Sequence, residues 1–158
     1  MMINYLATAT MAIGLLAGAP RAPHWEASYG KALEETRSGE DPLLVVLDKP
    51  NSKEARIEPA LLSQESAGDK HSKLLRPYRL CHVDVTTDYG QKVAEAFHAK
   101  NFPHVAIIDK TGSMVIFKKS GKIKQSEWDD ILTSHKSGER PKATSSRPYC
   151  PNCQRSQF

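Results

Sequence analysis

An uninterrupted apolar run, Leu43 to Leu47 with the sequence LLVVL, is the feature that most constrains the fold. A strand with one face in water alternates apolar and polar residues, whereas a strand covered on both faces is apolar throughout. The run therefore predicts a central strand of a sheet that is covered on both sides.

The segments around this run predict an alternation of helices and strands. The expected helices cover residues 25–37, 53–66, 89–100 and 125–135, and the expected strands cover residues 43–47, 79–85, 105–108 and 114–117. We expect Ser52 and Asp88 to cap the second and third helices, and Pro59 to kink the second. Residues 68–77 are expected to form a loop. This order predicts an α/β fold with a mixed central sheet and helices on both faces.

The N-terminal segment differs from the rest of the chain. Residues 1–22 contain no acidic residue and carry an apolar stretch from Tyr5 to Ala19. Small residues at Ala17 and Ala19, with Ala22 as a further candidate, give the cleavage-like pattern that is typical of a secretory signal peptide. The stretch is shorter than the roughly 20 residues that span a membrane. We therefore expect a periplasmic or secreted protein with no stable membrane span once the leader is removed. The alternative is a leader on a cytoplasmic protein.

Positive charge is concentrated in a C-terminal tail, residues 139–158, which follows the predicted domain of residues 23–138. The chain has a formal net charge of +4, and the tail holds four Arg and Lys residues against one Glu. The tail has almost no aliphatic side chains, so we expect it to be flexible. Because the domain itself is nearly neutral, a nucleic-acid partner is not expected.

The three cysteines are Cys81, Cys150 and Cys153. Cys81 lies in a predicted strand, and we expect a small buried hydrophobe there instead of a reactive thiol beside His82. The Cys-Pro-Asn-Cys motif of the tail leaves three possibilities open. It could be a disulfide, an idle reduced pair, or half of a zinc site completed by a second chain or by His135. Only five residues follow it, too few for the stable helix that activates similar motifs in glutaredoxins.

The order of elements, with Phe102-Pro103 directly before the hairpin strands, resembles the thioredoxin superfamily over residues 25–136. Members of that superfamily carry Cys-x-x-Cys after the first central strand and a proline five residues after the second cysteine. Pro59 lies five residues after Glu54 here, so Asn51-Ser52-Lys53-Glu54 occupies the motif. The resemblance implies a thioredoxin-like three-layer sandwich.

The same resemblance implies roles for two further residues. Pro103 corresponds to the cis-proline that faces the active-site loop and shapes a peptide groove. Gly121 corresponds to the glycine that follows the hairpin, where backbones approach closely.

The sequence departs from the superfamily at the positions that carry its chemistry. Disulfide exchange needs an attacking thiolate and a second thiol that resolves the mixed disulfide. Asn51 and Glu54 supply neither. The buried acid that many thioredoxins place six residues before the first motif cysteine corresponds to Val45. We therefore do not expect an enzyme that works through this site, and no cofactor is expected.

The leading hypothesis is a non-catalytic thioredoxin-like domain that binds a protein or peptide partner, in the manner of an added strand. The candidate groove residues are Asn51, Ser52, Lys53, Glu54, Phe102, Pro103 and His104. The plain alternative for residues 51–54 is a capping turn, and for His104 a partly exposed strand residue. Two other hypotheses stay open: a thiol-disulfide oxidoreductase that uses Cys150 and Cys153, and a zinc-dependent assembly module built on the same pair.

Overall fold

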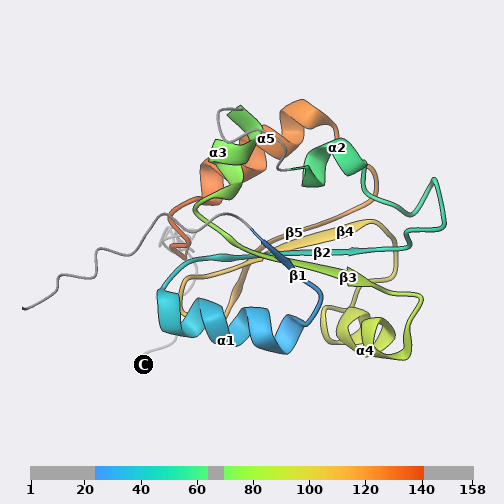
Figure 1. The fold of residues 1–158 in the computed structure, drawn as a ribbon, viewed down its shortest axis with the longest axis horizontal. Coiled ribbons are helices and arrows are strands. Elements are labelled where there is room, and N and C mark those ends of the chain that lie inside the picture. The colour runs from blue at the N-terminus through green and yellow to red at the C-terminus, as the bar shows by residue number, and fades with distance from the viewer. Residues whose placement is uncertain (1–23, 64–69, 141–158) are drawn as a thin grey trace, which may run out of the picture.

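The computed structural model describes residues 24–63 and 70–140, which form three layers (Figure 1). The strands are β1 (Trp25–Glu26), β2 (Leu43–Asp48), β3 (Arg79–Asp84), β4 (His104–Ile108) and β5 (Val115–Ser120). The helices are α1 (Tyr29–Gly39), α2 (Pro59–Leu62), α3 (Lys70–Leu75), α4 (Asp88–Ala96) and α5 (Gln125–His135). Helices α2, α3 and α5 lie on one face of the sheet, and α1 and α4 lie on the other (Figure 1).

The central sheet is mixed, as predicted, and has the strand order β1-β3-β2-β4-β5. Strands β1, β3 and β2 are parallel, whereas β4 is antiparallel to both β2 and β5. Because β2 and β4 run in opposite directions, the end of β2 lies beside the beginning of β4, where Leu47 pairs with His104. The loops before β4 and after β2 therefore meet at one edge of the sheet.

Strand β2 confirms the prediction of a strand covered on both faces. All six of its residues are buried. Leu44 and Val46 enter the core under α2, α3 and α5, whereas Leu43, Val45 and Leu47 enter the core under α1 and α4. Each such side chain contributes about 1.5–3 kcal/mol by leaving water, so this one strand anchors both cores.

The prediction for the first helix is wrong at its beginning. Trp25 lies in β1, and its indole nitrogen donates a hydrogen bond to the carbonyl oxygen of Leu62 at 2.9 Å. Helix α1 begins only at Tyr29, because Ser28 has extended backbone and its hydroxyl accepts the backbone N–H of Lys31. This is an ordinary N-cap.

The predictions for residues 53–58 and 68–77 are also wrong. Residues 49–58 form turns, and Pro59 is the first residue of the short helix α2 instead of a kink inside a longer one. Proline suits this position because the first amide of a helix has no intrahelical partner to lose. The predicted loop at residues 68–77 contains α3.

The third helix also differs from its prediction at both ends. Thr87, and not Asp88, is the N-cap residue of α4, and its hydroxyl accepts the N–H of Gly90 at 3.0 Å. The helix ends at Ala96 instead of residue 100. The predictions for β3, for the β4–β5 hairpin and for α5 are confirmed to within a few residues.

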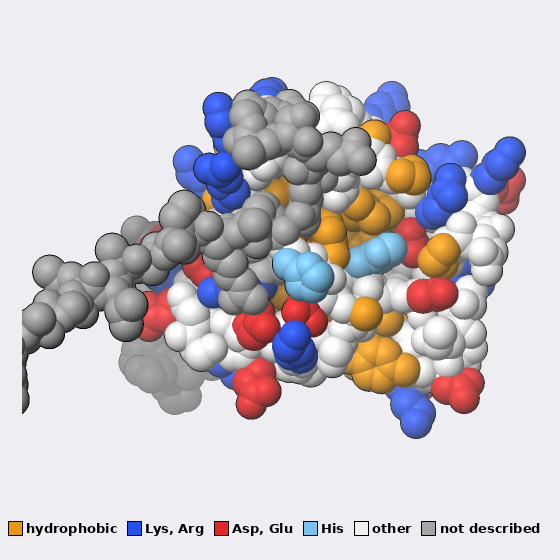
Figure 2. Space-filling view, viewed as in Figure 1, with side chains coloured by type: hydrophobic (Ala, Val, Ile, Leu, Met, Phe, Trp, Pro, Cys, Tyr) orange, Lys and Arg blue, Asp and Glu red, His pale blue; other side chains and the backbone are white. Residues whose placement is uncertain are grey.

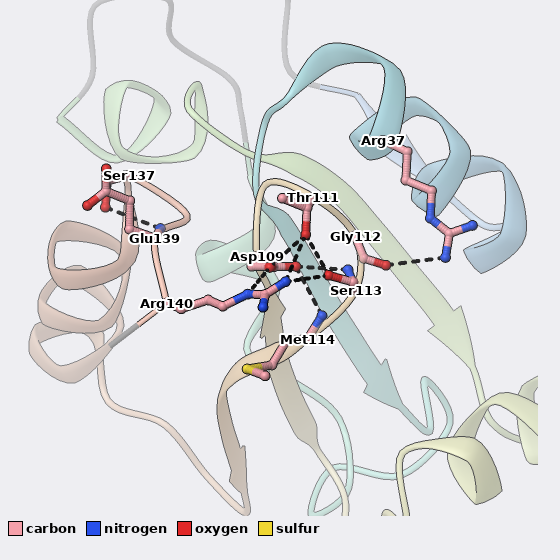
Figure 3. A network of polar contacts seen from close by, with 9 residues as sticks. All are labelled: Arg37, Asp109, Thr111, Gly112, Ser113, Met114, Ser137, Glu139 and Arg140. Carbon is pink, nitrogen blue, oxygen red and sulfur yellow. Dashed lines mark hydrogen bonds and ion pairs between the residues drawn. The ribbon is translucent and has the colours of Figure 1, made fainter. Parts of the chain in front are cut away.

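A network of polar contacts closes the turn between β4 and β5 (Figure 3). Asp109 is buried, and its carboxylate accepts hydrogen bonds from the guanidinium of Arg140 at 2.8 Å and the hydroxyl of Thr111 at 2.8 Å. The backbone amides of Ser113 and Met114 also donate to it, at 2.8 and 3.0 Å. Burial alone would raise the pKa of Asp109, but these hydrogen bonds outweigh burial and hold the pKa well below its usual range.

Two predicted segments lie largely or wholly outside the described residues: the leader of residues 1–22, and the tail with Cys150 and Cys153. Within the described ranges, no helix combines the length and the apolar character needed to cross a membrane.

Candidate functional site

The turn that replaces the Cys-x-x-Cys motif lies beside the loop that precedes β4. The ammonium group of Lys49 lies 5.4 Å from the centre of the Phe102 ring. The peptide bond between Phe102 and Pro103 is cis. Gly121, with a φ of +94°, donates its N–H to the carbonyl oxygen of Pro103 at 2.7 Å. The start of β4 and the end of β5 are thereby joined at this edge of the sheet.

A groove of about 430 Å³ opens at this edge. It is lined by Lys53, Arg56, Ile57, Glu58, Pro59, Pro103, Lys122, Ile123 and Lys124. Its floor is apolar because Ile57, Pro103 and Ile123 are buried, and its rim is charged because all four cations and Glu58 are exposed. Apolar surface with a few polar groups at its border is the usual composition of a binding site.

The charge of the rim is strongly one-sided, with four cations against the single carboxylate of Glu58. None of these four cations has an ion pair within residues 24–63 and 70–140. Lys124 is also the N-cap residue of α5, and its side chain makes no capping hydrogen bond. The N-cap side chain therefore leaves the first-turn amides of α5 uncapped, and the one carboxylate of that turn, Glu127, is paired with Lys119.

The structure brings together only some of the candidate groove residues. Lys53 and Pro103 line the groove, and Phe102 lies beside them under Lys49. The other three members of the turn, Asn51, Ser52 and Glu54, do not line it. Ser52 caps a turn and not a helix, because its hydroxyl accepts the N–H of Ala55 at 3.3 Å.

His104 does not line the groove, and it is buried where partial exposure was expected. Its ring centre lies 6.4 Å from that of Phe97, on the α1 and α4 side of the sheet. Its Nδ1 is 2.7 Å from the hydroxyl of Ser120. Burial, with a smaller contribution from Lys118, lowers the pKa of His104. Successive strand residues point to opposite faces, and His104 follows Pro103 directly, so it turns away from the groove.

A buried carboxylate and a histidine, which the sequence does not mark as a pair, lie beneath the same loop. The side chain of Asp48 is 1% exposed, and its Oδ1 is 2.9 Å from Nε2 of His82 on β3. Its Oδ2 accepts the backbone N–H of Ile57 at 3.0 Å. Asp48 therefore ties the loop after β2 both to the neighbouring strand and to the floor of the groove.

A second cavity, of about 290 Å³, lies against this pair. It is lined by Asp48, Pro50, Arg56, Ile57, Pro59, Leu62, Ser63 and His82. We call it the His82 cavity. It shares Arg56, Ile57 and Pro59 with the groove. The two hollows are therefore neighbours across a common wall.

The described thiol is remote from this site. Cys81 is buried in the core under α1 and α4, as predicted, and burial together with the nearby charge of Glu26 raises its pKa to about 12. Val45, at the position of the expected acid, is a buried hydrocarbon. Within the described ranges no cluster of three or more metal-ligating side chains occurs. His135 there contacts the Ile131 carbonyl oxygen at 2.9 Å through its Nδ1.

Comparisons with known proteins identify structures of the same fold but no similar sequence. No protein-family profile and no curated protein sequence matches the chain. Among solved structures, a thioredoxin from Thermus thermophilus superposes with a TM-score of 0.56 at 17% identity, over 72% of this chain and 87% of that one. Thioredoxin O2 from Arabidopsis thaliana in its oxidized state gives 0.56 at 10% identity, over 72% and 93%. A poplar thioredoxin h gives 0.55 at 14% identity, over 72% and 96%.

These similarities show that the chain has the thioredoxin-like fold, as the sequence predicted. The shared part spans most of the chain and nearly all of each neighbour. At such low identity the similarity establishes the architecture, and function has to be argued from the residues at the site.

Proposed function

We propose that this thioredoxin-like domain binds an extended peptide segment of a protein partner in the groove beside Pro103, without disulfide chemistry at residues 51–54. The observation that carries the proposal is the combination of an intact groove and a missing nucleophile. The groove, whose floor is formed by the buried residues Ile57, Pro103 and Ile123, lies beside a turn that holds an amide and a carboxylate where thiols would be needed.

The chemistry of the site supports binding over exchange. A disulfide is attacked by a thiolate, and the fraction of thiolate falls as the thiol pKa rises. Cys81 has a raised pKa and lies in the other core, so it serves neither as nucleophile nor as resolving thiol for the groove. Asn51 and Glu54 have no sulfur to replace it.

A photo-crosslinking experiment tests the proposal on the full chain. A photoreactive amino acid replaces Lys122, which is exposed on the groove rim, and in a control variant it replaces Lys92, which is exposed on α4. After incubation with a library of extended peptides, we expect peptide adducts at position 122 and few at position 92. Equal labelling at both positions, or none at either, would contradict a peptide-binding groove.

Thiol exchange through Cys150 and Cys153 is the competing function, and it makes a different prediction. If the tail carries the activity, the full chain reduces insulin disulfides and the Cys150→Ser, Cys153→Ser variant does not. We expect both proteins to be inactive in that assay. Rapid turnover that disappears in the variant would favour the oxidoreductase.

A further inference from the structure

Building on the function proposed above, we infer that the bound peptide segment is acidic and that one of its apolar side chains enters the His82 cavity. The groove and the His82 cavity are adjacent hollows of different character, one with a cationic rim and one mainly apolar. Together they specify the chemistry of a ligand more narrowly than either does alone.

The charge of the groove favours an acidic ligand. Lys53, Arg56, Lys122 and Lys124 stand around a floor of three buried apolar residues, and within the described residues no carboxylate pairs with any of the four. Charge complementarity steers encounter and excludes partners of like sign. A peptide with several Asp or Glu residues would bring the missing counter-charges.

The lining also argues for a peptide and against a nucleic acid. Single-stranded nucleic acids are held by aromatic side chains that stack on the bases. The groove lining contains proline, isoleucine and charged residues but no aromatic ring. Glu58 on the rim would repel a phosphate backbone, whereas an extended peptide can place a backbone amide or an uncharged residue there.

The His82 cavity provides for one apolar side chain. Four of its eight lining residues are apolar: Pro50, Ile57, Pro59 and Leu62. Its buried carboxylate, Asp48, is already occupied by His82 and by the N–H of Ile57, so it does not require a charged ligand. Its volume of about 290 Å³ lies at the lower limit for pockets that take whole small molecules, about 300–1,000 Å³. It therefore suits a single side chain of a segment that lies across the Ile57–Pro59 wall.

The chain's own tail, or the tail of a second copy, is a poor occupant. Residues 139–158 carry four Arg and Lys residues and one Glu. A segment of that charge is repelled by a cationic rim. The same reasoning disfavours contact between two copies of the groove, so the ligand is an acidic segment of another protein.

The test is a fluorescence-anisotropy titration of the full chain with labelled peptides. The reference peptide has several Asp residues and one Leu, and its matched versions replace every Asp with Asn or replace Leu with Ser. A labelled oligo-dT strand is the nucleic-acid probe. We expect the Asn peptide to bind at least about tenfold more weakly than the reference, and the Ser peptide about tenfold more weakly. Oligo-dT should bind more weakly than the reference peptide.

A charge-reversal variant locates the effect. Lys122→Glu with Lys124→Glu should weaken binding of the acidic peptide by about tenfold or more. The control, Lys92→Glu with Lys100→Glu, changes the net charge equally at exposed positions on and beyond α4 and should leave the affinity within about twofold. Thermal melts of both variants verify that they fold.

The outcomes separate the two proposals. Equal binding of the Asp and Asn peptides overturns the acidic specificity while leaving peptide binding intact, and equal binding of the Leu and Ser peptides overturns the role of the cavity. Oligo-dT binding as tight as the reference peptide, and lost in the groove variant, overturns the choice of a peptide. Binding of no peptide overturns the proposed function as well.

Discussion

The two ends of β4 differ in how they use their charged side chains. At the hairpin end, the buried Asp109 receives hydrogen bonds from Arg140, from a hydroxyl and from two backbone amides (Figure 3). The guanidinium of Arg37 donates to the Gly112 carbonyl oxygen in the same turn. At the Pro103 end, by contrast, four cations surround an apolar floor without an ion pair in the described part of the chain.

The space-filling view shows one face of the domain, where blue side chains lie at both the upper left and the upper right, around exposed apolar surface near the centre (Figure 2). A charged side chain that is paired within the domain contributes to stability, and it is not available to pair with a ligand. A charge left open contributes little to stability and remains available. The hairpin end therefore stabilises the fold, whereas the cations at the Pro103 end remain available to the ligand proposed above.

The largest effect is expected at the hairpin end. Asp109→Ala removes the buried acceptor of four hydrogen bonds and leaves the backbone amides of Ser113 and Met114 without their acceptor, which should lower the free energy of unfolding by about 3 kcal/mol. Urea unfolding followed by circular dichroism measures it. Asp130→Ala, at an exposed position of α5, is the control and should change stability by less than about 0.5 kcal/mol. If Asp109→Ala and Asp130→Ala lowered the free energy of unfolding equally, the polar network at the hairpin end would not stabilise the fold more than an exposed side chain does.

The next effect is at the base of the groove. Asp48→Ala leaves His82 and the amide of Ile57 without their buried acceptor. We expect the free energy of unfolding, measured by the same urea experiment, to fall by about 2 kcal/mol. We expect less than for Asp109 because fewer donors are lost. Exposure of the loop should also appear as faster hydrogen exchange of the Ile57 amide. Unchanged exchange there would show that the carboxylate does not hold the loop.

The third effect isolates the ionisation of Asp109. Its pKa is depressed in the folded state, so its charge stabilises the fold above the unfolded-state pKa, which is about 3.9. That contribution is lost as the pH falls below this value. The stability gap between the wild-type chain and Asp109→Asn should therefore shrink between about pH 5 and pH 3. Denaturant titrations across that range measure the gap, and a constant gap would argue against an ionised Asp109.

The smallest effect on stability is expected at the rim. Lys122→Ala with Lys124→Ala removes two cations that have no ion pair with any described residue, so the free energy of unfolding should change by less than about 0.5 kcal/mol. A loss above about 1 kcal/mol would mean that these side chains support the fold and are not held open for a ligand.

The elements that depend on local pattern could be predicted from the sequence. The run at residues 43–47 is apolar because both faces of β2 are covered, and the spacing of Trp128, Ile131 and Leu132 places α5 at its observed bounds. The mixed sheet followed from the order of these elements. The role of Pro59 did not, because a proline is compatible with both a kink and a first turn, and only the turns at residues 49–58 decide between them.

The site was predictable only in part, because its contacts are tertiary. Pro103 and Lys53 were identified through the resemblance to thioredoxins, but that resemblance does not say which way His104 points. Asp48 and His82 are separated by 34 residues and meet only through the pairing of β2 with β3. A polar residue that ends a fully buried strand was the available signal, since such a carboxylate needs a partner. The rim cations become a cluster only once the end of β5 lies beside Pro103.

The wall shared by the groove and the His82 cavity has a thermodynamic consequence. Ile57 belongs to both hollows, and its amide is fixed by the carboxylate that also holds His82. If a ligand on one side shifts this residue, the fit on the other side changes as well, and the occupancies of the two hollows are then linked. Linkage of this kind is reciprocal. The factor by which an occupied groove changes the affinity of the cavity for a side chain equals the factor by which an occupied cavity changes the affinity of the groove for its ligand.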